Sequence, residues 1–378
     1  MLWRKKLCVG AVIATVLFLM LASQTIQRRH SLSQSLATSF SRASMSRKDS
    51  STGIVVESTA SVADQLSKLE SDVPPNTPKP EPEAEVELLE KTQENKRPCG
   101  CSDSCISDLS ESKWFSEHYD PKQQPVLLGD NNNFDPDALK WWLALQRSGN
   151  DQTLEQVMSE MFRVISPPTV DATPPSQRCR KCAVVGNSGN LQQSKNGKLI
   201  DSHDFVIRMN KAVTRGFETD VGNRTTHHFM YPESAVDIDH GVSLVLLPFK
   251  LRDLEWLTSA LSTGTVKMTY MRVKERVAAD KDKVLVVNPV FFKYVNDHWT
   301  ERHGRYPSTG MLAIIFALHT CDQVSVFGYG ADKQGNWHHY WEENRYAGAF
   351  RKTGVHSADF ETEVIQQLAK NGKISLHL

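Results

Sequence analysis

The sequence predicts an α/β fold in which a mostly parallel, twisted sheet is flanked by helices within a single domain. Short apolar runs predict strands over residues 183–186, 205–210, 228–231, 242–249, 283–287 and 324–327. Helical patterns lie between them, after residue 249 and over residues 290–301 and 308–320. Short buried strands that alternate with helices are typical of a parallel sheet covered on both faces.

The N-terminus carries an apolar run without a charged residue over residues 7–26, with basic residues on both sides of it. At about 1.5 Å per residue this run spans roughly 30 Å, the thickness of a bilayer's hydrocarbon core. We therefore predict a cytosolic tail over residues 1–6 and an uncleaved transmembrane signal-anchor over residues 7–26, which would place the following residues in the lumen. The alternative is a cleaved signal peptide, for which residues 21–23 (Leu-Ala-Ser) form a poor cleavage site.

Residues 27–98 are rich in serine, proline and acidic residues. Such a composition buries too little apolar surface to offset chain entropy, so we predict a disordered stem that ends where the folded region, residues 99–378, begins. The formal net charge of the chain is zero, so no broad basic face for nucleic acid is expected.

Cysteine usage distinguishes an oxidising from a reducing compartment. Cys8 lies in the apolar run, and six further cysteines follow at positions 99, 101, 105, 179, 182 and 321. An even number in a luminal domain predicts three disulfides whose pairing the spacing does not decide. The alternative is a zinc site built from the pairs 99/101 and 179/182.

Small and amide residues follow three of the predicted strands. Residues 186–190 (Gly-Asn-Ser-Gly-Asn) follow the first, Asn210 ends the second, and residues 328–330 (Gly-Tyr-Gly) follow the last. Ligands of α/β proteins bind at the carboxyl ends of parallel strands, so these turns are candidate nucleotide-binding loops. They match neither the dinucleotide fingerprint nor the P-loop, and ordinary turns remain the alternative.

Residues 306–310 (Tyr-Pro-Ser-Thr-Gly) open a strongly apolar helix, with Ser308 as its N-cap. Free N–H groups at a helix start favour a phosphate or carboxylate, although a cap alone would also explain the pattern.

Histidines and aromatic residues gather over residues 337–361. His339 and His356 are too far apart for a recognised metal motif, and HExxH is absent, so an acid/base pair is at least as compatible as a metal trio. Trp337, Tyr340 and Trp341 could form a wall that stacks on a sugar, or could belong to the core.

Three Asp-x-Asp triplets, at 135–137, 237–239 and 280–282, are interpreted as chance because two precede strands and the first contains proline. This argues against a metal-bound diphosphate donor. A nucleoside monophosphate leaving group carries less charge, which protein donors could neutralise.

Four stretches in order resemble the sialylmotifs of animal sialyltransferases. Residues 182–190, 204–211 and 225–228 resemble the large motif, and residues 288–289, 304–310, 321 and 328–331 resemble the small motif. Residues 338–341 resemble the third motif, and residues 356–361 the very small one. Residues 141–146 and 336–341 bring the chain closest to the β-galactoside α-2,3-sialyltransferases that act on Galβ1-3GalNAc.

The resemblance implies a GT-A-like variant fold and a type II Golgi membrane protein whose catalytic domain is luminal. It implies CMP-sialic acid as donor and metal-independent, inverting transfer to the 3-hydroxyl of galactose. The acceptor would be Galβ1-3GalNAc on glycoproteins or glycolipids.

The resemblance also implies roles for individual residues. His356 matches the general base and His339 the group that neutralises the departing CMP phosphate. Donor-binding positions are Asn187, Asn210, Ser308, Thr309, Gly310 and Gly330. Positions near the acceptor or the sugar are Gln146, Tyr270, Tyr306 and Trp337. The disulfides implied are Cys99–Cys105, Cys101–Cys179 and Cys182–Cys321.

Asn223 begins a glycosylation sequon within the large motif. Competing functions are a luminal sialoglycan-binding module, a zinc hydrolase, and a sialyltransferase for Galβ1-4GlcNAc. The sequence leaves open the choice between glycoprotein and glycolipid acceptors, the formation of a homodimer, and the shedding of a soluble form.

Overall fold

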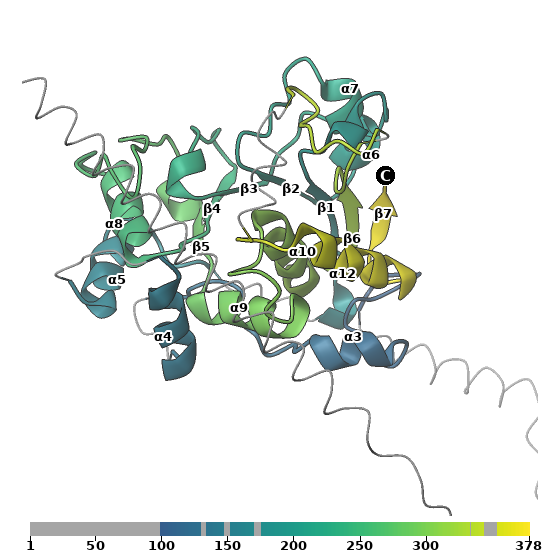
Figure 1. Ribbon diagram of the computed structural model, residues 1–378, viewed down its shortest axis with the longest axis horizontal. Helices are drawn as coiled ribbons and strands as arrows, with labels where there is room; N and C mark the ends of the chain where they lie inside the picture. The colour runs from purple at the N-terminus through teal and green to yellow at the C-terminus, as the bar shows by residue number, and fades with distance from the viewer. Residues whose placement is uncertain (1–98, 130–133, 147–151, 170–174, 333, 344–353) are drawn as a thin grey trace, which may run out of the picture. The chain divides into compact units, whose positions relative to one another are not determined.

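The computed structural model describes residues 99–129, 134–146, 152–169, 175–332, 334–343 and 354–378, which belong to the compact unit Pro80–Leu378 (Figure 1). The predicted tail, signal-anchor and stem, residues 1–98, lie outside the described residues. None of the helices in the described part of the chain is long and apolar enough to span a membrane.

The centre of the structure is a seven-stranded sheet in the order β5-β4-β3-β2-β1-β6-β7, and every neighbouring pair is parallel. The strands are β1 (Lys181–Val185), β2 (Phe205–Met209), β3 (His227–Met230), β4 (Ser243–Leu246), β5 (Val284–Val286), β6 (Gln323–Phe327) and β7 (Ser375–His377). The predicted parallel sheet is confirmed. Strand β7 was not predicted, because its three residues are partly exposed and contain no apolar run.

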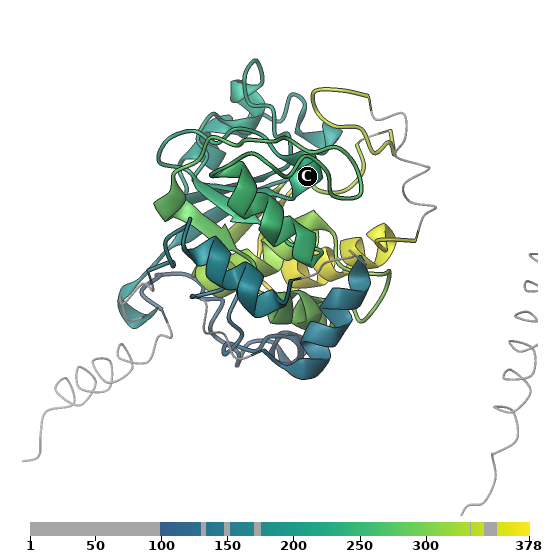
Figure 2. The same ribbon diagram turned by 90° about the vertical axis from the view of Figure 1, so that its left-hand side faces the viewer.

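Helices cover both faces of the sheet, as the two views in Figures 1 and 2 show. They are α3 (Lys113–His118), α4 (Pro136–Leu145), α5 (Leu154–Phe162), α6 (Gly197–Asp201), α7 (Glu218–Val221), α8 (Leu251–Ala260), α9 (Pro289–Tyr294), α10 (Thr309–Thr320) and α12 (Ala358–Lys370). Neighbouring residues of one strand belong to different apolar clusters: Val184 packs with α9, α10 and α12, whereas Val185 packs on the face that includes Ile200 of α6. This alternation is what a strand buried on both faces requires.

Helix α10 lies at the centre of the larger core. Its residues from Met311 to Leu318 are all buried, and Ser308 caps its N-terminus by accepting a hydrogen bond from the Met311 N–H at 3.1 Å. The predicted start of this helix is therefore confirmed. The helix predicted over residues 290–301 is shorter: α9 ends at Tyr294 and a π-helical turn, η6 (Val295–Trp299), follows. The wider turn closes with the Thr300 N–H donating to the Val295 carbonyl.

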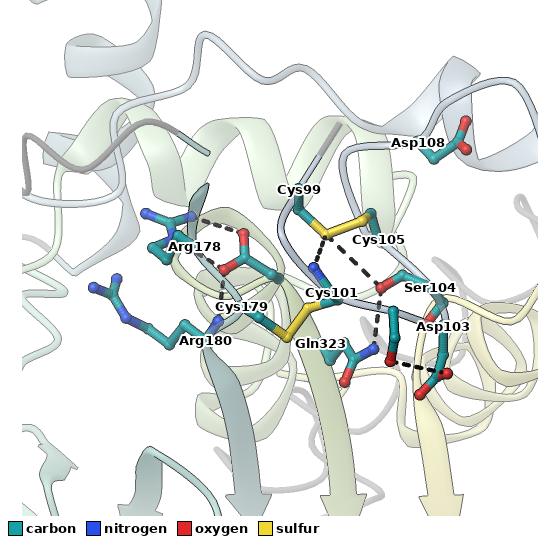
Figure 3. The surroundings of a disulfide bond; sticks show 12 residues. Cys99, Cys101, Asp103, Ser104, Cys105, Asp108, Arg178, Cys179, Arg180 and Gln323 are labelled. Carbon is teal, nitrogen blue, oxygen red and sulfur yellow. Dashed lines mark hydrogen bonds and ion pairs between the residues drawn. A yellow bond between two sulfur atoms is a disulfide. The ribbon is translucent and has the colours of Figure 1, made fainter. Parts of the chain in front are cut away.

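Three disulfides join Cys99 to Cys105, Cys101 to Cys179, and Cys182 to Cys321, so the pairings implied by the resemblance are confirmed. Figure 3 shows the first two beside the segment that leads into β1. The third joins β1 to the end of α10. The alternative zinc site is wrong, because all four of its sulfur atoms are in disulfides.

Candidate active site

A cavity of about 370 Å³ lies at the carboxyl ends of β1, β2 and β6. It is lined by the predicted residues Asn187, Asn210, Ser308, Thr309, Gly310, Gly330, Trp337, His339 and His356. All the predicted donor-binding and catalytic residues therefore line one cavity, although they come from five separate stretches of the chain.

Two glycines let the loops after β1 and β6 come together at the floor of this cavity. A Cβ atom on Gly186 would lie 2.3 Å from the carbonyl oxygen of Gly328, and Gly328 itself has a positive φ of +70°. Any side chain at Gly186 would force the loops apart. Glycine is needed at position 186 because the two loop backbones pack too closely there for a side chain.

Two amide oxygens in the cavity wall are buried and, within the described part of the chain, have no hydrogen-bond partner. They are Oδ1 of Asn187 and Oδ1 of Asn210. The Asn187 amide is oriented because its Nδ2 donates to the Met209 carbonyl at 3.1 Å. Leaving a buried acceptor unpaired costs about 1–3 kcal/mol, so these oxygens indicate a ligand that donates hydrogen bonds.

The N-terminus of α10 is attached to α12 through one carboxylate. Glu361 accepts hydrogen bonds from the Ser308 N–H at 2.8 Å and from the Ser308 hydroxyl at 2.5 Å. Burial raises the pKa of Glu361 to about 7, although both hydrogen bonds favour its charged form. Among the first-turn N–H groups of α10 are those of Thr309 and Gly310, which lack acceptors within the helix and suit an anionic ligand.

His356 is held in one tautomer by the backbone. Its Nδ1 lies 2.8 Å from the Tyr306 carbonyl oxygen, an atom that can only accept, so Nδ1 carries the proton and the lone pair of the neutral ring is on Nε2. Burial lowers the pKa of His356, and the hydrogen bond to Tyr306 opposes that shift only in part. The neutral ring, which is the form that can act as a base, is therefore favoured at neutral pH.

His339 is placed over the loop that follows β1. The Tyr340 N–H donates to the Asn187 carbonyl at 3.1 Å, and the His339 ring stacks on Trp341 with centroids 4.6 Å apart. Its Nδ1 lies 3.1 Å from a carboxylate oxygen of Glu342. With Nδ1 donating to Glu342, a protonated His339 could donate from Nε2 to an anion in the cavity.

Of the four residues expected near the acceptor, Trp337 lines the cavity, whereas Gln146, Tyr270 and Tyr306 are not part of its lining. The Gln146 amide donates to the Tyr306 hydroxyl at 3.2 Å, and the ring of Tyr306 lies 5.1 Å from that of His356. Tyr270 is 64% exposed. Tyr306 therefore contacts the candidate base directly, and Gln146 is joined to it through Tyr306.

The structure adds a buried charged cluster that the sequence analysis missed. Lys250 contacts Gln146, Glu233 and Asp253, and all three charged side chains of this group are nearly inaccessible to solvent. The available signal was a lysine between two apolar residues at the start of a helical pattern, which is a weak one.

Tyr340 does not belong to a sugar-stacking wall, contrary to one of the two interpretations. It is 1% exposed, packs with Phe217, and donates its hydroxyl to the Val213 carbonyl at 2.6 Å. Its ring stabilises the core because the aromatic body and the hydroxyl are both satisfied there.

The Asp-x-Asp triplets have structural roles. Asp135 caps α4, Asp237 accepts from the Ala278 N–H, and Asp280 accepts from the Gly241 N–H. Asp135 thus begins a helix and does not lie in a plain loop. In the part of the chain that the structure describes, no group of three or more His, Cys, Asp or Glu residues could hold a metal ion.

Residues 126–373 match the model of glycosyltransferase family 29 (sialyltransferase). The chain belongs to this family. The sialyltransferase is 54% identical over 281 residues to mouse CMP-N-acetylneuraminate-beta-galactosamide-alpha-2,3-sialyltransferase 2, covering 74% of this chain and 80% of the mouse protein. It is 52% identical over 282 residues to human CMP-N-acetylneuraminate-beta-galactosamide-alpha-2,3-sialyltransferase 1, covering 74% of this chain and 82% of the human protein.

Among solved structures, a mammalian sialyltransferase in complex with Gal-beta-1-3GalNAc-ortho-nitrophenol is 47% identical to this sialyltransferase. The TM-score is 0.68, and the alignment covers 74% of this chain and 99% of that one. The fold, the family and the enzyme class agree with the sequence analysis. The alternative hypothesis of a zinc hydrolase is wrong, because the chain belongs to a glycosyltransferase family.

Proposed function

We propose that this sialyltransferase transfers sialic acid from CMP-sialic acid to the 3-hydroxyl of the terminal galactose in Galβ1-3GalNAc, with inversion at the anomeric carbon. The observation that carries the proposal is the position of His356, held with Nδ1 protonated, in a cavity that is also lined by the start of α10. The names of the relatives support the donor, the linkage and the acceptor.

In the proposed reaction, the phosphate of CMP-sialic acid lies toward the N-terminus of α10 and toward His339. Hydroxyl or amino groups of the cytidine nucleotide donate to the amide oxygens of Asn187 and Asn210, which the structure leaves without a partner. These contacts orient the donor and stabilise negative charge as the bond to the phosphate oxygen breaks.

The acceptor galactose approaches from the side of Gln146, Tyr270, Tyr306 and Trp337. Nε2 of His356 takes the proton of the 3-hydroxyl as its oxygen attacks the anomeric carbon. The bond from that carbon to the phosphate oxygen breaks with its electron pair, and CMP leaves with protonated His339 beside its phosphate. The attack and the departure occur on opposite faces of the carbon, which inverts it.

The proposal includes independence from metal ions, because helix N–H groups and a histidine would balance the charge of a nucleoside monophosphate. The test is an assay of the detergent-solubilised full chain with CMP-sialic acid, in EDTA, against Galβ1-3GalNAc and Galβ1-4GlcNAc. We expect an α-2,3-linked product with the first acceptor. Activity that needs an added divalent ion would overturn the metal independence, a preference for Galβ1-4GlcNAc would overturn the acceptor, and CMP binding without product would indicate a binding module.

For localisation we propose a single-pass type II protein of the Golgi membrane with a luminal catalytic domain. The support is the uncharged run over residues 7–26 with basic residues before it. Asn223 is exposed in the loop after α7, so we also propose that it is glycosylated. Protease protection in sealed Golgi vesicles and a glycosidase-sensitive mass shift, absent in Asn223→Gln, test these points.

A further inference from the structure

Lys250 occupies an unusual position for a lysine. It is the residue before α8, its side chain is 4% exposed, and three oxygen atoms surround its ammonium group. These are Oε1 of Gln146 at 3.1 Å, Oε1 of Glu233 at 3.2 Å and Oδ1 of Asp253 at 2.7 Å. The contacts with Gln146 and Glu233 are hydrogen bonds and the contact with Asp253 is an ion pair, so one buried cation holds an amide and two carboxylates.

The ammonium group also connects segments that are far apart in the sequence. Gln146 ends α4, Glu233 lies in the turn after β3, and the ring of Tyr270 lies 4.9 Å from the lysine nitrogen. The Thr269 hydroxyl donates to Glu233, which ties the loop of Tyr270 to the same cluster. Side chains from three separate loops and helix ends are therefore held by one cation.

The contact with Gln146 determines what that amide can do. Because its oxygen accepts from Lys250, its nitrogen is directed to the Tyr306 hydroxyl at 3.2 Å. Tyr306 in turn packs against His356 and supplies the carbonyl oxygen that fixes its tautomer. A neutral amide without this cation could turn over and present the opposite hydrogen-bonding pattern.

We propose that Lys250 is a positioning residue of the acceptor site: it orients Gln146 and Tyr270 for the acceptor disaccharide and does not touch the donor. This inference rests on the proposed function, since it takes Gln146 and Tyr270 as acceptor-facing residues. A lysine that only stabilised the core would lower stability when replaced, without separating acceptor binding from donor binding.

The test compares Lys250→Gln with the matched variant Lys373→Gln in the full chain. Lys373 is another buried lysine, and it donates to the Asp108 carbonyl at 2.6 Å, away from the cavity. We expect Lys250→Gln to raise the KM for Galβ1-3GalNAc about tenfold or more, on the scale of one or two lost hydrogen bonds. The KM for CMP-sialic acid should stay within about twofold. Lys373→Gln should lower the melting temperature and leave both KM values unchanged.

Replacing the lysine leaves Glu233 and Asp253 buried without their cation, which threatens folding. The second variant is therefore Lys250→Gln with Asp253→Asn, in which the amide oxygen can still accept from the Phe249 N–H. A double-mutant cycle with Gln146→Ala adds a sharper readout. If Lys250 acts through Gln146, the two effects on the acceptor KM are not additive.

Equal losses of donor and acceptor affinity in a folded variant, or an unchanged acceptor KM, would overturn the proposal. Saturation-transfer NMR of Galβ1-3GalNAc binding in the presence of CMP distinguishes a failure of this proposal from a failure of the proposed function. If the wild type binds the disaccharide without forming product and Lys250→Gln no longer binds it, the proposed catalysis fails and the role of Lys250 stands. If neither protein binds the disaccharide, both fail.

Discussion

Replacing His356 with alanine removes the proposed general base, whose tautomer is held by the Tyr306 carbonyl. A positioned general base contributes roughly 10²- to 10⁴-fold to a rate. We therefore expect kcat to fall by at least about 100-fold, equivalent to about 2.7 kcal/mol of lost transition-state stabilisation. The loss should appear in kcat, because the proton transfer occurs only in the transition state.

A second variant controls for the hydrogen bond to Tyr306, which alanine also removes. In His356→Asn the amide nitrogen can replace Nδ1 as donor to the Tyr306 carbonyl, while no group replaces Nε2. We expect the same fall in kcat, with CMP affinity by calorimetry equal to that of the wild type.

The pH dependence gives an independent measurement. Burial lowers the pKa of His356 below its ordinary value of 6.5, so protonation should inactivate the enzyme only as pH falls through that lowered pKa. On the acid side, initial rates at saturating CMP-sialic acid should therefore decline at a pH below about 6.5, where His356 becomes protonated. If a folded His356→Asn protein retained a kcat within tenfold of the wild type, the assignment of the base would be refuted.

Further predictions concern the elements around the cavity. The folded-state pKa of Glu361, about 7, is above the ordinary 4.5, so the contribution of this carboxyl to stability is largest below pH 4.5 and is lost as pH rises toward 7. Glu361→Gln can still accept a hydrogen bond from Ser308 but does not titrate. The melting temperature of this variant should therefore depend less on pH between 4.5 and 7 than that of the wild type. The disulfide between Cys182 and Cys321, which are 139 residues apart, should contribute up to about 5 kcal/mol, so the double serine variant should unfold at markedly lower denaturant concentration. His339→Ala should lower kcat by about 10- to 100-fold and leave the acceptor KM unchanged, and an equal rise in that KM would contradict a role at the leaving group.

Much of the fold could be predicted because the strands from β1 to β6 are short, largely apolar runs followed within two residues by glycine, asparagine or proline. These residues mark the ends of the strands from β1 to β6, and the N-cap residue Ser308 marks the start of α10. Strand β7 could not be predicted, because it pairs only with β6 and is recruited by tertiary contact. The end of α9 could not be predicted either, since the π-helical turn leaves the apolar pattern of the sequence unchanged.

The donor side of the site was within reach of sequence reasoning, because Asn187, Asn210 and Gly330 all follow strands and must meet at one edge of the sheet. The pairing of the cysteines and the roles of the two histidines required the family resemblance. The cluster around Lys250 could not be predicted by either route, because its members come from three separate segments and no local pattern links them.

The attachment of Ser308 to Glu361 bears on how acceptor preference can diverge in this family. Glu361 and the proposed base His356 lie on one short stretch of chain, so that stretch joins His356 to the helix that would receive the donor. Gln146 is joined to this unit through its hydrogen bond to the Tyr306 hydroxyl, whereas Glu233 lies in another segment, the turn after β3. If Gln146 and Tyr270 face the acceptor as proposed, replacements in their segments would change which sugar is accepted and would leave the contact between α10 and α12 in place.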